Sequence, residues 1–262
     1  MSELQKHLLL ALTAVVAGVI NSLAGGGTLL TFPALAHIGA VRDLIANATN
    51  TVALVPGSAA GTWGYRREFR ASLRWVFLLA GPSLAGGVAG ALLLTRLDED
   101  YFDKAVPWLI LTATLLFLGQ PLFGRLASRP AIQSATSRRA IVLLVLFQFF
   151  VSVYGGYFGA GMGILMLSSL GLMGLGDIHR MNAVKSFLAV CINGISVVVF
   201  VIEDKVAWQF VPTMAIPAIV GGYLGAHYGR KLNRNLVRWI VVGIGFGLST
   251  YYFVTKYALF NA

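Results

Sequence analysis

The sequence has little charge and almost no cysteine. Of its 262 residues only 11% are charged, whereas a typical soluble domain has about 25%. A water-soluble enzyme of ordinary composition is therefore excluded, and so is a disordered chain, which combines low hydrophobicity with high charge. The single cysteine, Cys191, leaves no partner for an intramolecular disulfide or for a CxxC metal or redox pair.

Apolar residues are abundant and occur in blocks. They make up 57% of the chain and form ten stretches, and the charges lie mostly between these stretches. A helix needs about 20 apolar residues to cross the hydrocarbon core of a bilayer. We therefore predict an all-α, polytopic helical membrane protein. The stretches cover residues 8–24, 28–40, 44–64, 75–95, 105–123, 140–154, 162–175, 178–202, 206–229 and 236–254.

Four stretches are too short for a full crossing, and they form two pairs that are interrupted by glycine. The first pair is interrupted at 25–27 and the second at 155–156 and 159–163. Irregular backbone is tolerated at membrane depth only where protein or a cavity surrounds it. The clusters therefore predict broken or re-entrant helices, whose N–H groups at the start of a half-helix suit a bound anion. The candidate anion-binding glycines are Gly25, Gly26, Gly27, Gly159 and Gly161.

Basic residues are concentrated in alternate loops. The loops 65–74, 124–139 and 230–238 carry four Lys or Arg residues each, whereas 96–104 and 203–205 carry more acidic than basic residues. By the positive-inside rule the three basic loops are cytoplasmic and both termini lie outside, as for a protein of the cell (inner) membrane. The net charge of +10 is thus explained by membrane orientation, and we expect no nucleic-acid partner.

The two halves of the sequence match at an offset of about 135 residues. Asn47 and Ala48 recur as Asn182 and Ala183, and the block 82–91 recurs at 217–226 with the pattern P-x-x-x-G-G-x-x-G-A. Loops that follow equivalent segments have opposite charge, which indicates that the halves are inverted relative to each other. Inverted repeats are frequent in secondary transporters.

The match divides the chain into two repeats of about five helical segments each. The first transmembrane repeat is predicted at 1–124 and the second, inverted one at 140–262, with a cytoplasmic linker at 125–139.

Three motifs resemble the sulfite exporter TauE/SafE family. They are A-G-G-G-T-L-L-T-F-P-A-L at 24–35, N-A-T-N-T at 47–51 and P-x-x-x-G-G-x-x-G at 82–90. The resemblance runs from about residue 10 to residue 254, although the second half has G-A-G-M-G at 159–163 in place of the triple glycine. It implies a multi-pass carrier for small sulfur-containing anions such as sulfite, a sulfonate or thiosulfate.

Lys185 is the most informative side chain. It lies about eight residues into the stretch 178–202, which is about 12 Å along a helix axis and close to the membrane midplane. A charged residue at this depth is costly and usually faces a cavity or a counter-charge, yet none of the ten stretches contains Asp or Glu. Either backbone carbonyls of a broken helix satisfy Lys185, or it awaits an anionic substrate. We expect the second.

Polar residues surround Lys185 in the predicted helix. Asn182, Ser186 and Asn193 share a helical face with it. The corresponding polar set in the first half includes Asn47, Thr49 and Asn50. These residues either join helices through hydrogen bonds or contact the substrate, and Asn47 and Asn182 are the best candidates for contact.

The sequence leaves three classes of function open. A secondary anion transporter, with export as the expected direction, is favoured over an anion channel with a continuous pore. A membrane-embedded enzyme has least support. The GxGD element that ends at Asp177 matches intramembrane proteases, but it and Asp43 lie at the ends of stretches, where each is predicted to be a helix N-cap. We expect no catalytic residues, no metal and no cofactor. The expected partners are a small anion and the lipid bilayer, with homo-oligomerisation left open.

Overall fold

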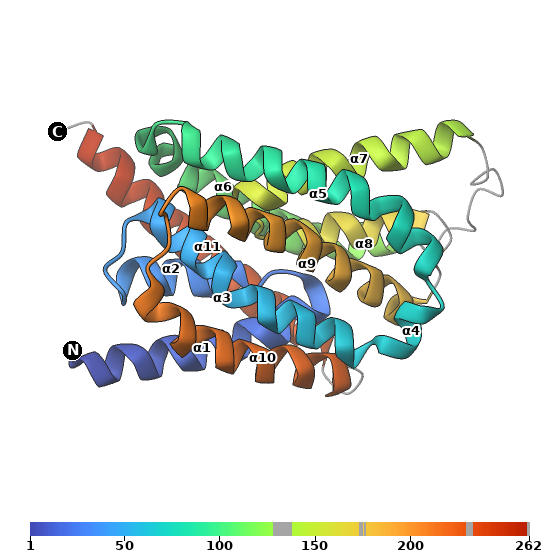
Figure 1. Cartoon of the computed structure of the whole chain (residues 1–262). Coiled ribbons are helices and arrows are strands. Elements are labelled where there is room, and N and C mark those ends of the chain that lie inside the picture. Colours follow the sequence, from blue (N-terminus) through green and yellow to red (C-terminus); the bar gives the residue numbers. More distant parts are fainter. Residues whose placement is uncertain (128–137, 173–174, 176, 229–232, 261–262) are drawn as a thin grey trace.

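The structure is a computed structural model that describes residues 1–127, 138–172, 175, 177–228 and 233–260. Within these residues the secondary structure is entirely helical, which confirms the predicted all-α class (Figure 1). Six of the helical segments are long and apolar enough to cross a membrane, as a polytopic protein requires. The elements are α1 (Glu3–Ala24), α2 (Thr28–His37), α3 (Asp43–Gly64), α4 (Arg66–Arg70), α5 (Leu73–Arg96), α6 (Glu99–Ala127), α7 (Arg138–Tyr157), α8 (Met162–Leu172), α9 (Ile178–Ile202), η1 (Trp208–Phe210), α10 (Val211–Tyr228) and α11 (Arg234–Phe260).

Each predicted stretch overlaps one α-helix of the structure. Local chemistry explains where α1 begins and ends. At its start, the Ser2 hydroxyl accepts a hydrogen bond from the Gln5 amide at 3.3 Å, and the Gln5 side chain accepts one from the Ser2 amide at 3.0 Å. This reciprocal pair is a capping box. At its end, Gly25 adopts the left-handed conformation with φ +75°, which glycine enters without strain.

Two helical hairpins enter the bundle from opposite ends. His7, near the start of α1, bonds Thr213 at the start of α10 with a distance of 2.8 Å, and His37 at the end of α2 packs on Tyr251 of α11. Both open ends of α1–α2 therefore lie where α1 begins and α11 ends, which we call the terminal end (Figure 1). The break at 25–27 is thus the turn of a helical hairpin, which agrees with the predicted interruption, whereas re-entry into a membrane stays a prediction.

The second hairpin, α7–α8, opens at the other end of the bundle. Leu144 near the start of α7 and Leu170 near the end of α8 share one buried cluster with Val76 near the start of α5. The short helix α4 lies at this end, which we call the α4 end (Figure 1). The predicted basic loop 65–74 is therefore at the α4 end. The loops 96–104 and 203–205 meet at the terminal end, where Lys205 bonds Glu99 at 3.2 Å.

The glycines of the repeated block make equivalent close contacts in the two halves. Gly90 of α5 lies against the backbone of Val153 in α7, and its counterpart Gly225 of α10 lies against Val19 in α1. A Cβ atom at either position would be too close to its neighbour. Tight packing through small residues therefore explains this motif. Although this pattern suits a repeat, the boundaries 1–124, 125–139 and 140–262 and the inversion across a membrane stay predictions, and residues 128–137 of the linker lie outside the described residues.

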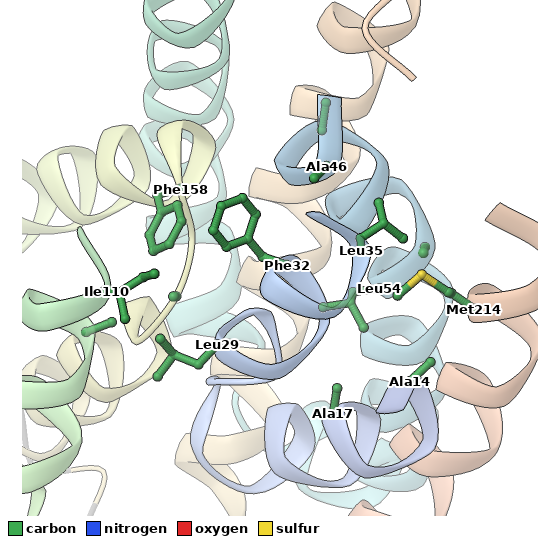
Figure 2. Packing of buried hydrophobic residues seen from close by; sticks show 14 of the residues in the cluster. Ala14, Ala17, Leu29, Phe32, Leu35, Ala46, Leu54, Ile110, Phe158 and Met214 are labelled. Carbon is green, nitrogen blue, oxygen red and sulfur yellow. The ribbon is translucent and has the colours of Figure 1, made fainter. Parts of the chain in front are cut away.

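A buried hydrophobic core surrounds the first hairpin. Figure 2 shows Phe32 of α2 against Phe158, the residue that follows α7. Their ring centroids are 5.5 Å apart in an edge-to-face arrangement. On the outside of the bundle, large apolar side chains are exposed, such as Phe77 at 77% and Ile202 at 76%. Extensive apolar surface of this kind is what a lipid-facing helix requires.

Candidate substrate-binding site

The two glycine breaks contact each other inside the bundle. The Gly161 amide donates to the Gly25 carbonyl at 3.3 Å, and a Cβ atom on Gly25 would lie 2.6 Å from the Cα of Gly163. Gly25, Gly159 and Gly161 have φ values of +75°, +80° and +79°. Glycine adopts this region readily, whereas side chains strain it. The breaks therefore require glycine both for their turns and for their close approach.

Lys185 lies beside this contact and is almost fully buried, with 1% of its surface exposed. Its ammonium donates to the carbonyl oxygens of Asn21 at 3.0 Å and Ser22 at 2.8 Å. These carbonyls belong to the last turn of α1, at the negative end of the helix dipole. This conformation therefore shows the first of the two arrangements considered for Lys185, with backbone carbonyls as partners. Its role in binding a substrate stays a prediction.

Asn47 makes the corresponding contact in the other half. Its side-chain amide donates to the carbonyl of Tyr157 at 2.9 Å, and Tyr157 is the last residue of α7. Helix α9 thus bonds the end of α1, and α3 bonds the end of α7. Helices α9 and α3 thus each donate a side-chain hydrogen bond to the end of a broken helix in the other half of the chain.

A small cavity connects Lys185 to the first break. It is lined in part by Lys185 and Ser186 of α9 and by Asn21, Ser22 and Gly25, and its volume is about 10 Å³. A single water needs roughly 10–15 Å³ by this measure, so the cavity holds one water at most. Asn21 and Ser22 were missed by the sequence prediction. The signal for them was two polar residues at the end of an apolar stretch, just before the glycines.

Buried polar atoms without a hydrogen-bond partner among the described residues occur along α3 and α9. Asn182, 1% exposed, has neither its amide nitrogen nor its oxygen paired. The Oδ1 of Asn47, the Nδ2 of Asn50 and the Oγ of Ser22 are also unpaired. Each such group costs about 1–3 kcal/mol when nothing binds it. Asn182, Asn47 and Asn50 belong to the predicted site, and their contact with a substrate stays a prediction.

Other predicted site residues hold helices together in this conformation. Asn50 accepts a hydrogen bond from Thr31 of α2, and the Thr49 hydroxyl accepts one from the Ala207 amide at 2.9 Å. Asn193 is 8% exposed and lies outside the cavity lining. Gly26 packs on the Phe117 ring. These contacts place Thr49 and Gly26 in helix packing and leave Lys185, Ser186 and Gly25 together at the cavity.

The break amides are bonded within the protein. Gly25 donates to Asn21 at 2.9 Å, Gly159 donates to Tyr154 at 3.2 Å, and Gly161 donates to Gly25. Gly27, the N-cap of α2, lies against the Ala17 carbonyl. Only the Gly161 amide bonds across the contact between the breaks, so movement of the breaks apart would free that amide, whereas the amides of Gly25 and Gly159 are bonded within their own segments.

The two aspartates at helix starts differ in role. Asp177 is an N-cap as predicted, since its carboxylate accepts from the His179 amide at 2.8 Å. The N-cap prediction for Asp43 was wrong: Asp43 is the first residue of α3, Arg42 stands at the cap, and Asp43 pairs with Lys256 at 2.8 Å. An ammonium contributed by a distant helix competes here with a local cap, which the sequence around Asp43 does not reveal.

Apolar helices around a buried polar centre, with two broken-helix hairpins that meet there, are features of secondary membrane transporters. The family model described as Sulfite exporter TauE/SafE matches residues 10–252. The chain belongs to this family, which confirms the resemblance seen in its motifs, and it is a multi-pass membrane transporter and not an enzyme.

Its relatives carry corresponding names. The probable membrane transporter protein ORF9 of Sinorhizobium sp. is 29% identical over 252 residues, covering 95% of this chain and 94% of the relative. A probable membrane transporter protein of Haemophilus influenzae is 28% identical, covering 88% of each chain. The probable membrane transporter protein YfcA of Escherichia coli K12 is 29% identical, covering 87% of this chain and 82% of the relative. No solved structure matches the chain.

Proposed function

We propose that this protein is a secondary transporter, an exporter, of a small sulfur-containing anion such as sulfite, a sulfonate or thiosulfate. The observation that carries the proposal is Lys185, a lysine that is 1% exposed beside the contact between the two breaks. Residues charged at membrane depth usually mark a substrate path. The name of the family supports the class of anion. Asn182 and Ser186 lie on the same helix and orient the substrate.

The anion replaces the α1 carbonyls as the partner of Lys185. A bond to a charged acceptor is roughly twice as strong as one to a neutral acceptor, so an anion competes well with the carbonyls of Asn21 and Ser22. Because the cavity has a volume of about 10 Å³, the anion enters only when the end of α1 moves away from Lys185. Binding is thereby linked to movement of the first hairpin, as alternating access between the repeats requires.

The packed centre supports a carrier over a channel, since a channel needs a continuous pore. We propose that the α4 end is cytoplasmic in the inner membrane, that both termini lie outside, and that the membrane potential drives export. An inside-negative potential is worth about 2.3 kcal/mol per charge per 100 mV, so a divalent anion leaves the cell without a coupling ion.

The test is flux in liposomes that contain purified protein. Sulfite, thiosulfate, sulfate, sulfoacetate and a simple carboxylate are compared as substrates, with empty liposomes as the control. We expect saturable flux of at least one sulfur-containing anion. Flux of carboxylates alone would contradict the substrate class, and flux that never saturates would indicate a channel.

A further inference from the structure

A basic hollow opens at the α4 end of the bundle. It has a volume of about 300 Å³ and is lined in part by Arg66 and Arg67 of α4, by Glu68 and by His227 of α10. Both arginines are exposed to solvent. Two guanidinium groups against one carboxylate leave the hollow positive, and a charged cleft concentrates ions of the opposite sign.

Tyr65 separates this hollow from the bundle interior. It lines the hollow, yet it is only 3% exposed because it packs with Ala183 of α9 and Ala226 of α10. Its ring centroid lies 6.3 Å from that of His179 in the first turn of α9. The Tyr65 ring therefore lies between the hollow and Ala183, the residue that follows Asn182 in α9.

Buried polar atoms continue from Tyr65 to the cavity beside Lys185. The Nδ1 atom of His179 and both side-chain polar atoms of Asn182 are buried and unpaired among the described residues. His179, Asn182 and Ser186 recur at intervals of three and four residues, so they follow one face of α9. Ser186 lines the cavity together with Lys185. This face therefore carries polar side chains over the whole distance, and those of His179 and Asn182 have atoms without a partner among the described residues.

The opposite side of the cavity is closed by a thicker barrier. Four aromatic side chains that are exposed by 2% or less pack against one another there in edge-to-face, stacked and tilted pairs: Phe32, Phe102, Phe158 and Tyr252. Beyond them, the Glu99 carboxylate binds both Arg42 and Lys205. Four buried rings thus close the terminal end, against the one ring of Tyr65 described at the α4 end, and the Glu99 ion pairs lie at the surface beyond these four rings.

We infer that anions pass between the central site and the α4 end along the His179–Asn182–Ser186 face of α9, with the basic hollow as vestibule and Tyr65 as the gate. The ligand of the vestibule is a small anion of the transported class, so the inference rests on the proposed function. It adds the route, the gate and the residues that select charge before the substrate reaches Lys185.

Cysteine labelling tests this route without requiring transport. In a Cys191→Ser background, Asn182→Cys is treated with an anionic sulfonate or a cationic trimethylammonium methanethiosulfonate, added to either face of membrane vesicles. Ser186→Cys is a second, nearly isosteric reporter should Asn182→Cys fail to fold. Ala71→Cys, at an exposed position beside α4, identifies the face on which α4 lies.

We expect the reporters to react from the face of Ala71→Cys and faster with the anionic reagent, after correction for each reagent's reactivity with a free thiol. The anionic reagent should react roughly tenfold faster than the cationic one, which is the lower end of the range for a charged cleft. The double variant Arg66→Gln with Arg67→Gln should remove most of this difference in rate. Tyr65→Ala should accelerate labelling severalfold.

Two controls separate the route from general opening of the bundle. Asn47→Cys is the equivalent position in the first half, where the Asn47 amide bonds Tyr157, and Val76→Cys is buried at the α4 end in a different cluster. Both should label far more slowly than the reporters. Reaction of the reporters from the opposite face only, from neither face, or without charge preference would overturn the inference. Since labelling needs no turnover, a failed flux assay would leave this result intact.

Discussion

Asp43 and Lys256 form an ion pair of 2.8 Å that joins the first residue of α3 to the last part of α11. Asp43 is 9% exposed, and the side chain of Lys256 is 25% exposed and also binds Asp103 at 3.0 Å. The pair therefore connects the two halves of the chain at the terminal end. Through Lys256, this contact joins α3 and α6 to α11 at that end.

Loss of Lys256 should destabilise the protein more than loss of Asp103. Lys256→Gln leaves the buried Asp43 carboxylate without its charged partner, and breaking a buried pair in this way costs about 3–5 kcal/mol. Partial exposure of Lys256 reduces this to roughly 1–3 kcal/mol, within the range for a buried group left unpaired. Asp103→Asn should cost less, because Asp103 is 38% exposed. Thermal unfolding in detergent measures both, and an unchanged melting temperature for Lys256→Gln would contradict the role of the pair.

Replacement of Gly25 should be far more damaging than replacement of a glycine with free space around it. Gly25→Ala places a Cβ atom 2.6 Å from Gly163 and requires φ +75°, a region that costs other residues about 1–2 kcal/mol before any clash. Gly194 lies in α9, and a Cβ atom added there would have no neighbour within 4 Å among the described residues. Gly194→Ala should therefore be neutral or slightly stabilising, by up to about 1 kcal/mol. Equal yields and melting temperatures for the two variants would refute the contact between the breaks.

Removal of the Lys185 charge should abolish transport while the fold remains. Lys185→Gln can still donate to the α1 carbonyls of Asn21 and Ser22, but it gives no charge to a bound anion. Lys185→Arg keeps the charge with a different shape, so it should retain part of the activity. The measurement is liposome flux at matched protein density. If Lys185→Gln transports as fast as the wild type, the lysine is structural and the carbonyl contacts are its whole role.

The orientation of the bundle can be tested independently of substrate. Ala71 beside α4 and Asp100 at the start of α6 are both exposed, and they lie at opposite ends. If the α4 end is cytoplasmic, an impermeant thiol reagent added to whole cells should label Asp100→Cys and not Ala71→Cys. The reverse pattern would place the positively charged end outside and would remove the basis for potential-driven export.

The sequence predicts well what depends on local chemistry. Long apolar runs specify helices, and the cluster at Gly25 specifies a break, because hydropathy and backbone freedom are properties of neighbouring residues. The depth of Lys185 follows from counting residues along one helix. The partners of Lys185 do not, since the carbonyls of Asn21 and Ser22 lie more than 160 positions away in the chain.

The same reason explains the assignments that sequence could not make. Thr49 was grouped with the site because it is polar and near Asn47, yet its hydroxyl accepts from the Ala207 amide. Aspartate is favoured at helix N-caps, yet Asp43 pairs with Lys256. A polar residue on a membrane helix can join helices or face a ligand, and only the packing of distant segments decides between the two.

Asn47 and Asn182 provide the sharpest comparison, because equivalent positions in the two halves have different partners. Asn47 donates to the Tyr157 carbonyl at 2.9 Å. Asn182 is equally buried, but its side-chain atoms have no partner among the described residues. Asn47→Leu should therefore destabilise the protein by about 1–3 kcal/mol, since it leaves a buried carbonyl unpaired.

Asn182→Leu should lower transport without lowering the stability of the protein. It removes two unpaired polar atoms and breaks no hydrogen bond that the structure describes, so the melting temperature should stay the same or rise. If Asn182 contacts the anion on its way to Lys185, transport should nevertheless fall strongly, because the substrate loses a donor inside the membrane. Thermal unfolding and liposome flux on the same preparations measure both effects. A variant that is stable and fully active would show that Asn182 does not contact the substrate, whereas a stable and inactive variant would identify it as a functional residue.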